Sequence, residues 1–534
     1  MRYAARVAVS IVGWLFVVSA VAQGTHEHAE RPAASLTEES IGVVRFETSC
    51  APEVTDVFNR AVSLLHSFWF PEARAAFEQA LRVDPQCAIA YWGIALTHWG
   101  NPFAGLRAPQ TIALGKTAID KGLSTGKPTE RERAYLDAVA HLFANDDVRT
   151  QRARVLEHEA AMGKLAAAYP NDVEAQIFWA LAITQAAEPE DKTFVRQLKA
   201  GAILEPLFDR MPKHPGLAHY IIHAYDVPPL AAKALPAALA YADIAPAVPH
   251  ALHMPSHTFT RVGMWRESVA TNQRSAETAE RTKEPGAVLH ALDYMAYAYL
   301  QMGMDSQAKE VVERANRLVA TGANPFALAA IPARYALERQ QWAEAANLSV
   351  PTFAAPPYVE AMTRFARAIG AARSGDTKAA APEIDRLQAL RERALAMQDT
   401  YWAEIIDIQR RGALAWVLFG EGKTREALDA MRAAADAEDA TEKSAVTPGP
   451  LAPAREMLGL MLLQSGRYEE ALAAFDAAIA KEPNRFLSLY GAGRAAERAQ
   501  RQELARKYYR QIATICKDAS DERPELVHAR RMAT

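Results

Sequence analysis

Cysteine is scarce in this chain of 534 residues, which contains only Cys50, Cys87 and Cys516. Three thiols are too few for a small domain that relies on many disulfides. No two of them form a CxxC pair, so neither a thiolate zinc site nor a dithiol redox motif is expected. Cys50 and Cys87 either pair in an oxidising compartment, leaving Cys516 free, or all three are buried as small apolar side chains.

The chain also lacks a strong excess of charge, because 60 basic and 63 acidic residues leave a net charge of −3. That balance does not supply the basic surface that binds nucleic acid or anionic lipid, so no nucleic-acid partner is expected. A glycine-rich phosphate loop, a G-x-S-x-G elbow and an H-E-x-x-H zinc motif are missing as well. The sequence therefore does not point to any of these enzyme classes.

Long apolar runs are missing except near the first residue. Two arginines precede an uncharged apolar run over residues 7–18, and the small-x-small pattern Ala-Val-Ala follows over residues 20–22. This is the pattern of a cleaved signal peptide over residues 1–22, and it predicts a periplasmic or secreted protein that begins at Gln23. The alternative is a membrane anchor. The run is shorter than the roughly 20 residues that a spanning helix needs, so no stable membrane anchor is expected.

A repeated pattern of small and large apolar residues indicates the fold class. The pattern A-x3-F-x2-A-x4-P occurs over residues 73–85 and again over residues 471–483. Small residues allow two helices to touch, the large residue fills the gap between them, and proline ends the turn. This is the second half of a tetratricopeptide repeat (TPR). It predicts an all-α, TPR-type α-solenoid of stacked antiparallel helix pairs.

Weaker copies of the repeat and the distribution of proline suggest the domain organisation. The predicted main array of TPR and TPR-like helices covers residues 51–446, with irregular helical hairpins between about residues 101 and 191. The remaining predicted segments are a flexible N-terminal segment 23–50, a Pro-rich linker 447–453, a C-terminal TPR pair 454–518 and a fraying tail 519–534.

Several longer stretches resemble a group of bacterial exported TPR proteins that are largely uncharacterised. The stretch PHALHMPSHTFTRVGMW from Pro249 is one of them, and related sequences tend to carry His where Ser444 stands here. The resemblance implies a TPR fold and names no reaction. The same resemblance is seen in the stretches that begin at Leu64, Leu198, Leu289, Ala440 and Pro483.

Histidines are concentrated in one part of this array, because seven of the fourteen lie between His214 and His290. From His219 to His253 and from His223 to His257 the separation is 34 residues, which equals the TPR period. Equivalent positions of stacked repeats lie side by side along a solenoid. The spacing therefore predicts that these imidazoles come together on one face of successive first helices.

Neutral imidazoles and carboxylates in one groove form a ligand set for zinc, copper or non-haem iron. We expect His219, His223, His253 and His257 to hold one divalent transition metal. Pro255 would not disturb the last pair if it stands in the first helical turn. The same groove-facing positions are expected to carry further residues, the first four of which are alternative ligands or partners of the ligands: Asp226, His250, His290, Asp293, Tyr297, Arg334 and Glu456.

Three functions are compatible with this pattern. The first is an exported scaffold whose concave groove binds a peptide, a protein or a small ligand, with or without a bound metal. The second is a metal-dependent hydrolytic or oxidative enzyme that uses the His/Asp cluster at residues 219–293. The third is a structural assembly factor without a small ligand. Histidines in a groove can also simply hydrogen-bond a peptide. His66 and His98 lie off the groove face, and His98 is interpreted as a core residue.

Overall fold

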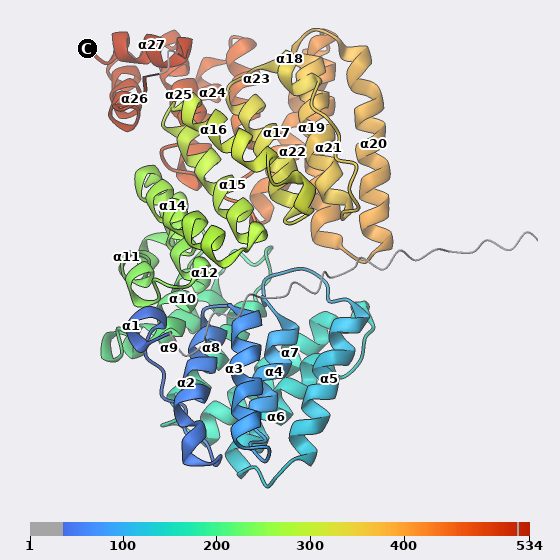
Figure 1. Cartoon of the computed structure of the whole chain (residues 1–534). Coiled ribbons are helices and arrows are strands. Elements are labelled where there is room, and N and C mark those ends of the chain that lie inside the picture. The colour runs from blue at the N-terminus through green and yellow to red at the C-terminus, as the bar shows by residue number, and fades with distance from the viewer. Residues whose placement is uncertain (1–35, 521–522) are drawn as a thin grey trace, which may run out of the picture. The chain divides into compact units, whose positions relative to one another are not determined.

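A computed structural model describes residues 36–520 and 523–534, and the predicted signal peptide lies outside the described residues. Within the described ranges the chain forms helices and no strand, as the sequence predicts. Consecutive helices pack against one another along the chain. In Figure 1 the green helices around α10–α15 lie between the blue N-terminal helices and the yellow to red C-terminal ones.

The N-terminal part contains short α1 and eight longer helices. Their bounds are α1 (Glu38–Ile41), α2 (Thr55–His66), α3 (Phe70–Val83), α4 (Ala90–Trp99), α5 (Pro109–Ser124), α6 (Glu130–Ala140), α7 (Gln151–Ala168), α8 (Val173–Gln185) and α9 (Val195–Arg210). The departure from the regular repeat between residues 101 and 191 is thus still helical, with α6, α7 and α8 close to the expected positions.

The middle part carries most of the histidine-rich segment. Its helices are α10 (Pro215–Ala224), α11 (Leu235–Ile244), α12 (Pro249–His253), α13 (Pro255–Val262), α14 (Trp265–Thr282), α15 (Pro285–Gln301), α16 (Asp305–Asn316), α17 (Pro325–Glu338) and α18 (Trp342–Ala346). Pro255 is the first residue of α13, where its missing N–H costs nothing.

The C-terminal part continues the same packing. Its helices are α19 (Pro357–Arg373), α20 (Thr377–Ala396), α21 (Thr400–Gly420), α22 (Thr424–Ala440), α23 (Ala454–Gln464), α24 (Tyr468–Lys481), α25 (Phe486–Arg498), α26 (Gln502–Ile515) and α27 (Pro524–Met532). Short 3-10 turns lie at η2 (Pro52–Val54), η3 (His141–Phe143), η4 (Val148–Thr150), η5 (Ala231–Ala234) and η6 (Val319–Thr321).

In the two full repeats, a large aromatic residue of one helix packs against a glycine in the next helix. Phe77 on α3 is fully buried and contacts Phe58 with ring centroids 5.4 Å apart. A Cβ atom on Gly93 of α4 would overlap the Phe77 ring. The second full repeat has the same arrangement, because a Cβ on Gly491 would overlap the ring of Phe475. The repeat signature therefore encodes a close approach of two helices that only glycine permits.

Three segments pack more closely than the sequence suggests. Within the segment 23–50, the part from residue 36 onward is not loose, since Ile41, Val44 and Phe46 are buried against the core. Residues 447–453 do not separate two domains, because α22 packs directly on α23 and the loop itself is largely buried. The tail 519–534 forms α27, whose Leu526 and Ala529 are buried. Apolar side chains in each segment account for the difference.

The C-terminal repeats contact the middle of the chain. Trp265 of α14 donates its indole N–H to the Asn484 carbonyl over 2.9 Å. The Asn484 side chain donates in turn to the Gly263 carbonyl. Gly263 has a φ of +72°, and a Cβ there would meet the Pro483 carbonyl, so the turn between α13 and α14 needs glycine for two reasons.

Cys50 and Cys87 form a disulfide, and Cys516 is free and buried. Of the two possibilities that the sequence left open, the pairing is the one found in the structure. None of the helices in the described ranges combines the length and apolar character needed to cross a bilayer.

Replacing Phe77 by alanine should destabilise the protein by about 3–5 kcal/mol, the cost of truncating an interior aromatic residue. Val83→Ala on the same helix is a control, since Val83 is 49% exposed and its truncation should cost little. Urea denaturation followed by circular dichroism measures both. Equal stability of the Phe77→Ala variant and the wild type would contradict the role of this residue in closing the helix pair.

Candidate metal centre

Four helices bring six histidines together. His219 and His223 lie one turn apart on α10, His250 and His253 lie on α12, His257 follows on α13, and His290 lies on α15. They form two triads in which one ring nitrogen of each histidine lies within 4.8 Å of the others. Triad A consists of His219, His223 and His250, and triad B consists of His253, His257 and His290.

The triads regroup the predicted ligands. The sequence predicts one ion shared by the pairs 219/223 and 253/257, but the two pairs fall into different triads. His250 and His290, expected as alternative ligands, complete the two triads instead. The helix geometry explains the regrouping, because His250 and His253 stand almost one turn apart on α12 and so serve neighbouring sites.

Two pairs of ring nitrogens face each other at short range. His219 Nε2 and His250 Nε2 are 3.2 Å apart in triad A. His253 Nε2 and His257 Nε2 are 3.1 Å apart in triad B. Which of these nitrogens carries a proton follows from the partner of the other nitrogen in each ring.

The tautomer of His253 is fixed by Asn272 of α14. The Asn272 Nδ2 atom donates to the Ser268 carbonyl over 2.7 Å, so its Oδ1 atom faces the imidazole. His253 Nδ1 lies 2.7 Å from that oxygen and must be the donor. In the neutral ring, Nε2 of His253 therefore carries a lone pair rather than a proton.

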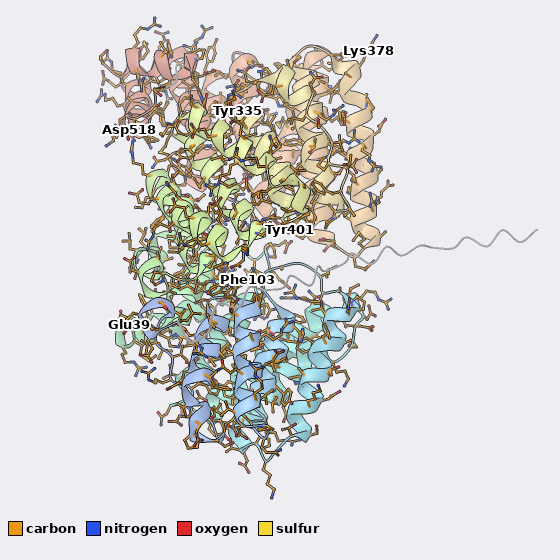
Figure 2. All side chains as sticks on the ribbon, in the orientation of Figure 1. Glu39, Phe103, Tyr335, Lys378, Tyr401 and Asp518 are labelled. Carbon is orange, nitrogen blue, oxygen red and sulfur yellow. A yellow bond between two sulfur atoms is a disulfide. The ribbon has the colours of Figure 1, made fainter. Side chains whose placement is uncertain are left out.

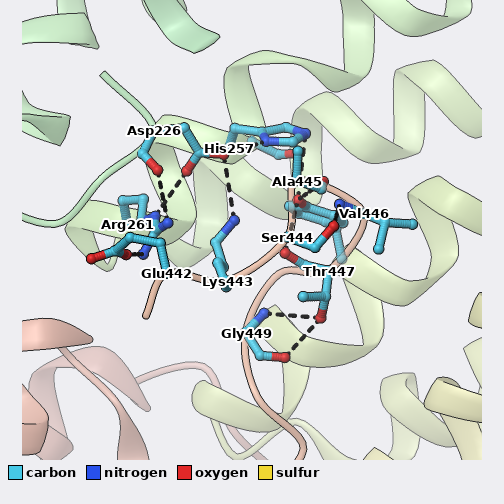
Figure 3. A network of polar contacts seen from close by, with 12 residues as sticks. Asp226, His257, Arg261, Glu442, Lys443, Ser444, Ala445, Val446, Thr447 and Gly449 are labelled. Carbon is cyan, nitrogen blue, oxygen red and sulfur yellow. Dashed lines mark hydrogen bonds and ion pairs between the residues drawn. The ribbon is translucent and has the colours of Figure 1, made fainter. Parts of the chain in front are cut away.

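The tautomer of His257 is fixed by Asp226. Asp226 Oδ2 lies 3.0 Å from His257 Nδ1, and the carboxylate accepts this hydrogen bond because Arg261 and Lys443 also donate to it. Figure 3 shows these four side chains converging, with Lys443 reaching in from the loop after α22. His257 Nε2 is thus also unprotonated in the neutral ring, and two lone pairs face each other across 3.1 Å.

Triad A is arranged differently. His219 Nδ1 donates to the His66 carbonyl over 2.6 Å, so its Nε2 is a lone pair that His250 Nε2–H can approach as donor. His223 Nε2 is buried and has no hydrogen-bond partner among the described residues. A buried imidazole nitrogen without a partner is costly, so this atom is available to a ligand.

Burial keeps all six imidazoles neutral. Removal from water is the main cause that lowers the pKa of each ring, and neighbouring imidazoles lower the pKa of five of them further. For His290 the pKa falls to about 3. At His257 the neighbouring Asp226 carboxylate opposes the effect of burial. Neutral imidazole is the form that binds metal ions.

The site is covered rather than open to a groove. His219 and His253 are 0% and 2% exposed. Phe68 meets His219 edge-on with ring centroids 4.4 Å apart, and Phe103 packs against His223 at 4.2 Å, so both phenylalanines cover triad A. Phe103, labelled in Figure 2, lies where the N-terminal helices meet the middle of the chain. The sequence could not show this cover, because it comes from segments more than 100 residues away.

Tyr294 and Asn272 were missed by the sequence analysis. The Tyr294 hydroxyl lies 3.4 Å from His257 Nε2 and also bonds the carbonyls of Ala445 and Thr447. Its position four residues after His290, on the same helix face, was a usable signal. Arg261 likewise follows His257 by four residues, which was a weaker signal. The sequence held no signal that would have placed Asn272 or Lys443 at the site.

The other predicted groove residues form buried ion pairs instead. Asp293 pairs with Arg334 at 3.2 Å, and both side chains are 0% exposed. Arg334 also donates to the carbonyls of Gly449 and Pro450 and so holds the loop before α23. Burial raises the pKa of Asp293, which Arg334 opposes.

Tyr297 and Glu456 belong to a second buried network. Arg485 bonds both oxygens of Glu456 at 2.7 and 3.1 Å, and it donates to the Tyr297 hydroxyl. It also pairs with Glu338. These contacts join α15, α17, α23 and α25, so the two residues hold helices together and do not line an open groove.

A third cluster contains a carboxylate between two imidazoles. Glu174 accepts from His66 and His214 at 2.8 and 2.9 Å, and all three side chains are nearly inaccessible. His66 is fully buried in this cluster. His98, the histidine that the sequence interprets as a core residue, is only partly buried. The Nε2 atoms of His66 and His214 both contact Glu174, and the ligand atoms of the three side chains lie within 4.8 Å of one another.

An apolar cavity of about 80 Å³ lies on the other side of the loop 441–449. Phe326, Tyr358 and Trp402 line it on one side, and Arg261 and Lys443 line it on the side of triad B. Its volume would hold several waters, at roughly 10–15 Å³ each, or one side chain of a ligand. Lys443 therefore touches both the cavity and the carboxylate that holds His257.

Comparison with known proteins supports the repeat fold. Residues 70–102 and 456–520 match the family model of the tetratricopeptide repeat, which covers the two segments with the full signature. No curated protein was found to match the chain. With its helices packed in adjacent pairs, the chain is an all-α, TPR-like solenoid, and TPR arrays generally mediate protein–protein interaction.

Replacing Arg334 by methionine should destabilise the protein by about 3–5 kcal/mol, because Asp293 is then left buried and unpaired. The double variant Asp293→Asn/Arg334→Met removes the stranded charge and should cost less than the two single changes together. Thermal and urea unfolding of the double-mutant cycle measure the coupling energy. Arg149→Met, at a side chain that is 73% exposed, is the control and should change stability little. Additive single effects would contradict a direct pair.

Proposed function

We propose that this chain is an exported helical-repeat scaffold that binds a divalent transition metal through its buried histidine triads. The observation that carries the proposal is the pair of unprotonated Nε2 atoms of His253 and His257, 3.1 Å apart. Two lone pairs at this distance repel each other in the neutral state. A cation between them removes the repulsion and uses both lone pairs.

The distances also fit a shared ion. Two nitrogens bound at about 2.0–2.1 Å to a tetrahedral ion are roughly 3.3 Å apart. The Nε2 pairs of His253/His257 and His219/His250 lie at 3.1 and 3.2 Å. Only small movements would therefore be needed to complete the ligand geometry.

The surroundings of the ligands have the form expected around a bound metal. Metal-binding histidines commonly donate their other N–H group to a carboxylate or carbonyl, which fixes the ring and makes it a better donor. His257 donates to Asp226, His253 donates to Asn272, and His219 donates to the His66 carbonyl. Zinc, copper and iron all accept imidazole ligands.

Two features support export. Residues 1–22 have the sequence pattern of a signal peptide. The Cys50–Cys87 disulfide suits an oxidising compartment, where such bonds persist.

The scaffold role extends to a macromolecular partner. TPR arrays generally bind peptides or proteins along their surface, and we propose a peptide or protein partner for this chain as well. A second candidate, a metal-dependent hydrolytic or oxidative enzyme, is favoured by one observation. The apolar cavity beside triad B shares Lys443 with the network at His257, so a small molecule bound there would lie close to the metal.

Protein purified without a histidine tag should contain a transition metal when analysed by inductively coupled plasma mass spectrometry. His257→Ala and His223→Ala should each lower the metal content by at least one half, because each removes one ligand of a triad. His141→Ala is the matched control, because His141 is partly exposed and contacts Glu157 rather than a histidine of either triad. Circular dichroism checks that each variant is folded. If the folded His257→Ala and His223→Ala variants keep the wild-type metal content, or the wild type binds no added zinc, copper or iron, metal binding is excluded.

A further inference from the structure

We infer that triads A and B form one paired centre that holds two copper ions, one in each triad. This inference rests on the proposed metal binding and adds the number of ions, their proximity and the identity of the metal. It starts from the repeated plan of the site. Each triad consists of two histidines four residues apart in the sequence, together with a third histidine from a later helix, which is α12 for triad A and α15 for triad B.

The two triads interlock through α12. His250 belongs to triad A and His253 belongs to triad B. The two residues are three positions apart on α12, and three residues of α-helix rise only about 4.5 Å, so the two triads lie close together. Rings of the two triads also touch, since the centroids of His223 and His257 are 5.9 Å apart and those of His250 and His253 are 6.1 Å apart. An ion lies about 3 Å from the centre of the ring that binds it, so the two ions would be at most about 12 Å apart.

The donor set favours copper. Each triad offers three imidazole nitrogens and no thiolate or carboxylate. Imidazole suits zinc, copper, iron and nickel, whereas magnesium, calcium and manganese prefer oxygen ligands. Among the divalent ions copper binds such nitrogen sites most tightly. Zinc bound by three histidines keeps a fourth position for water or substrate, so the preference for copper rests on its tighter binding to nitrogen ligands.

The two sites should not be equivalent. In triad B the ring of His257 donates to the Asp226 carboxylate, which Arg261 and Lys443 hold in place. In triad A the ring of His219 donates to a neutral backbone carbonyl. A carboxylate partner raises the basicity of the imidazole more than a carbonyl does. Triad B should therefore fill first.

The test uses the full chain without a histidine tag, freed of metal by a chelator and titrated with Cu(II). Mass spectrometry of the metal content and electron paramagnetic resonance (EPR) are the readouts. We expect two copper ions per chain and, at full loading, a Cu(II) signal that is broadened or reduced by interaction between the two ions. At one equivalent the signal should be that of a single isolated ion.

His250→Gln and His290→Gln are matched variants, because each removes the third ligand of one triad at a partly buried position. Each should bind one copper ion with an unperturbed EPR signal of full intensity. His290→Gln should lower the affinity for the first equivalent of copper, whereas His250→Gln should not. His141→Gln should behave as the wild type, and circular dichroism verifies folding.

The possible failures are distinguishable. One ion per chain, or two ions whose signals are independent, would overturn the paired centre and leave metal binding intact. Two bound ions with zinc retained against equimolar copper would overturn the assignment of copper. Binding of no metal at all would overturn both the paired centre and the proposed function.

Discussion

Burying an imidazole nitrogen without a partner is costly, and this cost constrains how the middle of the molecule is arranged. His253 and His257 each direct one nitrogen to a fixed acceptor, Asn272 or Asp226. Their remaining nitrogens then face each other, since both acceptors lie on the outer side of the rings. The helices α10, α12, α13 and α15 are held at the spacing that these contacts permit.

The cost of burying unpartnered polar groups also connects distant parts of the chain to the histidine-bearing helices. Asp226 is satisfied only by also accepting from Lys443 of the loop after α22, and Arg334 satisfies both Asp293 and the carbonyls of Gly449 and Pro450. These buried charges must be paired, so they fix the loop 441–449 over triad B. The loop in turn forms one wall of the apolar cavity. Triad B, the loop and the cavity are thus physically connected through Lys443.

A metal held by the triads would be largely shielded from water, because four of the six imidazoles are buried and only His250 and His290 are partly exposed. Aromatic rings of Phe68, Phe103 and Tyr294 cover the triads, and burial lowers the pKa of each imidazole. A neutral, dry and preformed set of nitrogens does not have to lose protons or reorganise when an ion arrives. This is a different arrangement from a peptide groove, in which the same side chains would be exposed to solvent. In the proposed function the helices around the triads would hold the metal, while the remaining surface of the TPR-like array would be available to a partner.

The sequence by itself determined the helical class, the repeat and the gathering of the histidines. The signature over residues 73–85 and 471–483 specifies a close helix pair, and the 34-residue spacing predicts that the histidines of successive repeats gather. The structure confirms this for His223 and His257, whose ring centroids are 5.9 Å apart, whereas His219 lies against His250 rather than His253. What only the tertiary structure decided is how these rings are grouped and what covers them. The third ligand of each triad depends on the local tilt of α12 and α15, which periodicity does not encode. Asp293 and Arg334 have groove-like spacing but pair with each other between the neighbouring helices α15 and α17. Tyr297 and Glu456 both bond Arg485, because the C-terminal repeats contact the middle of the solenoid and bury residues that an isolated repeat would expose.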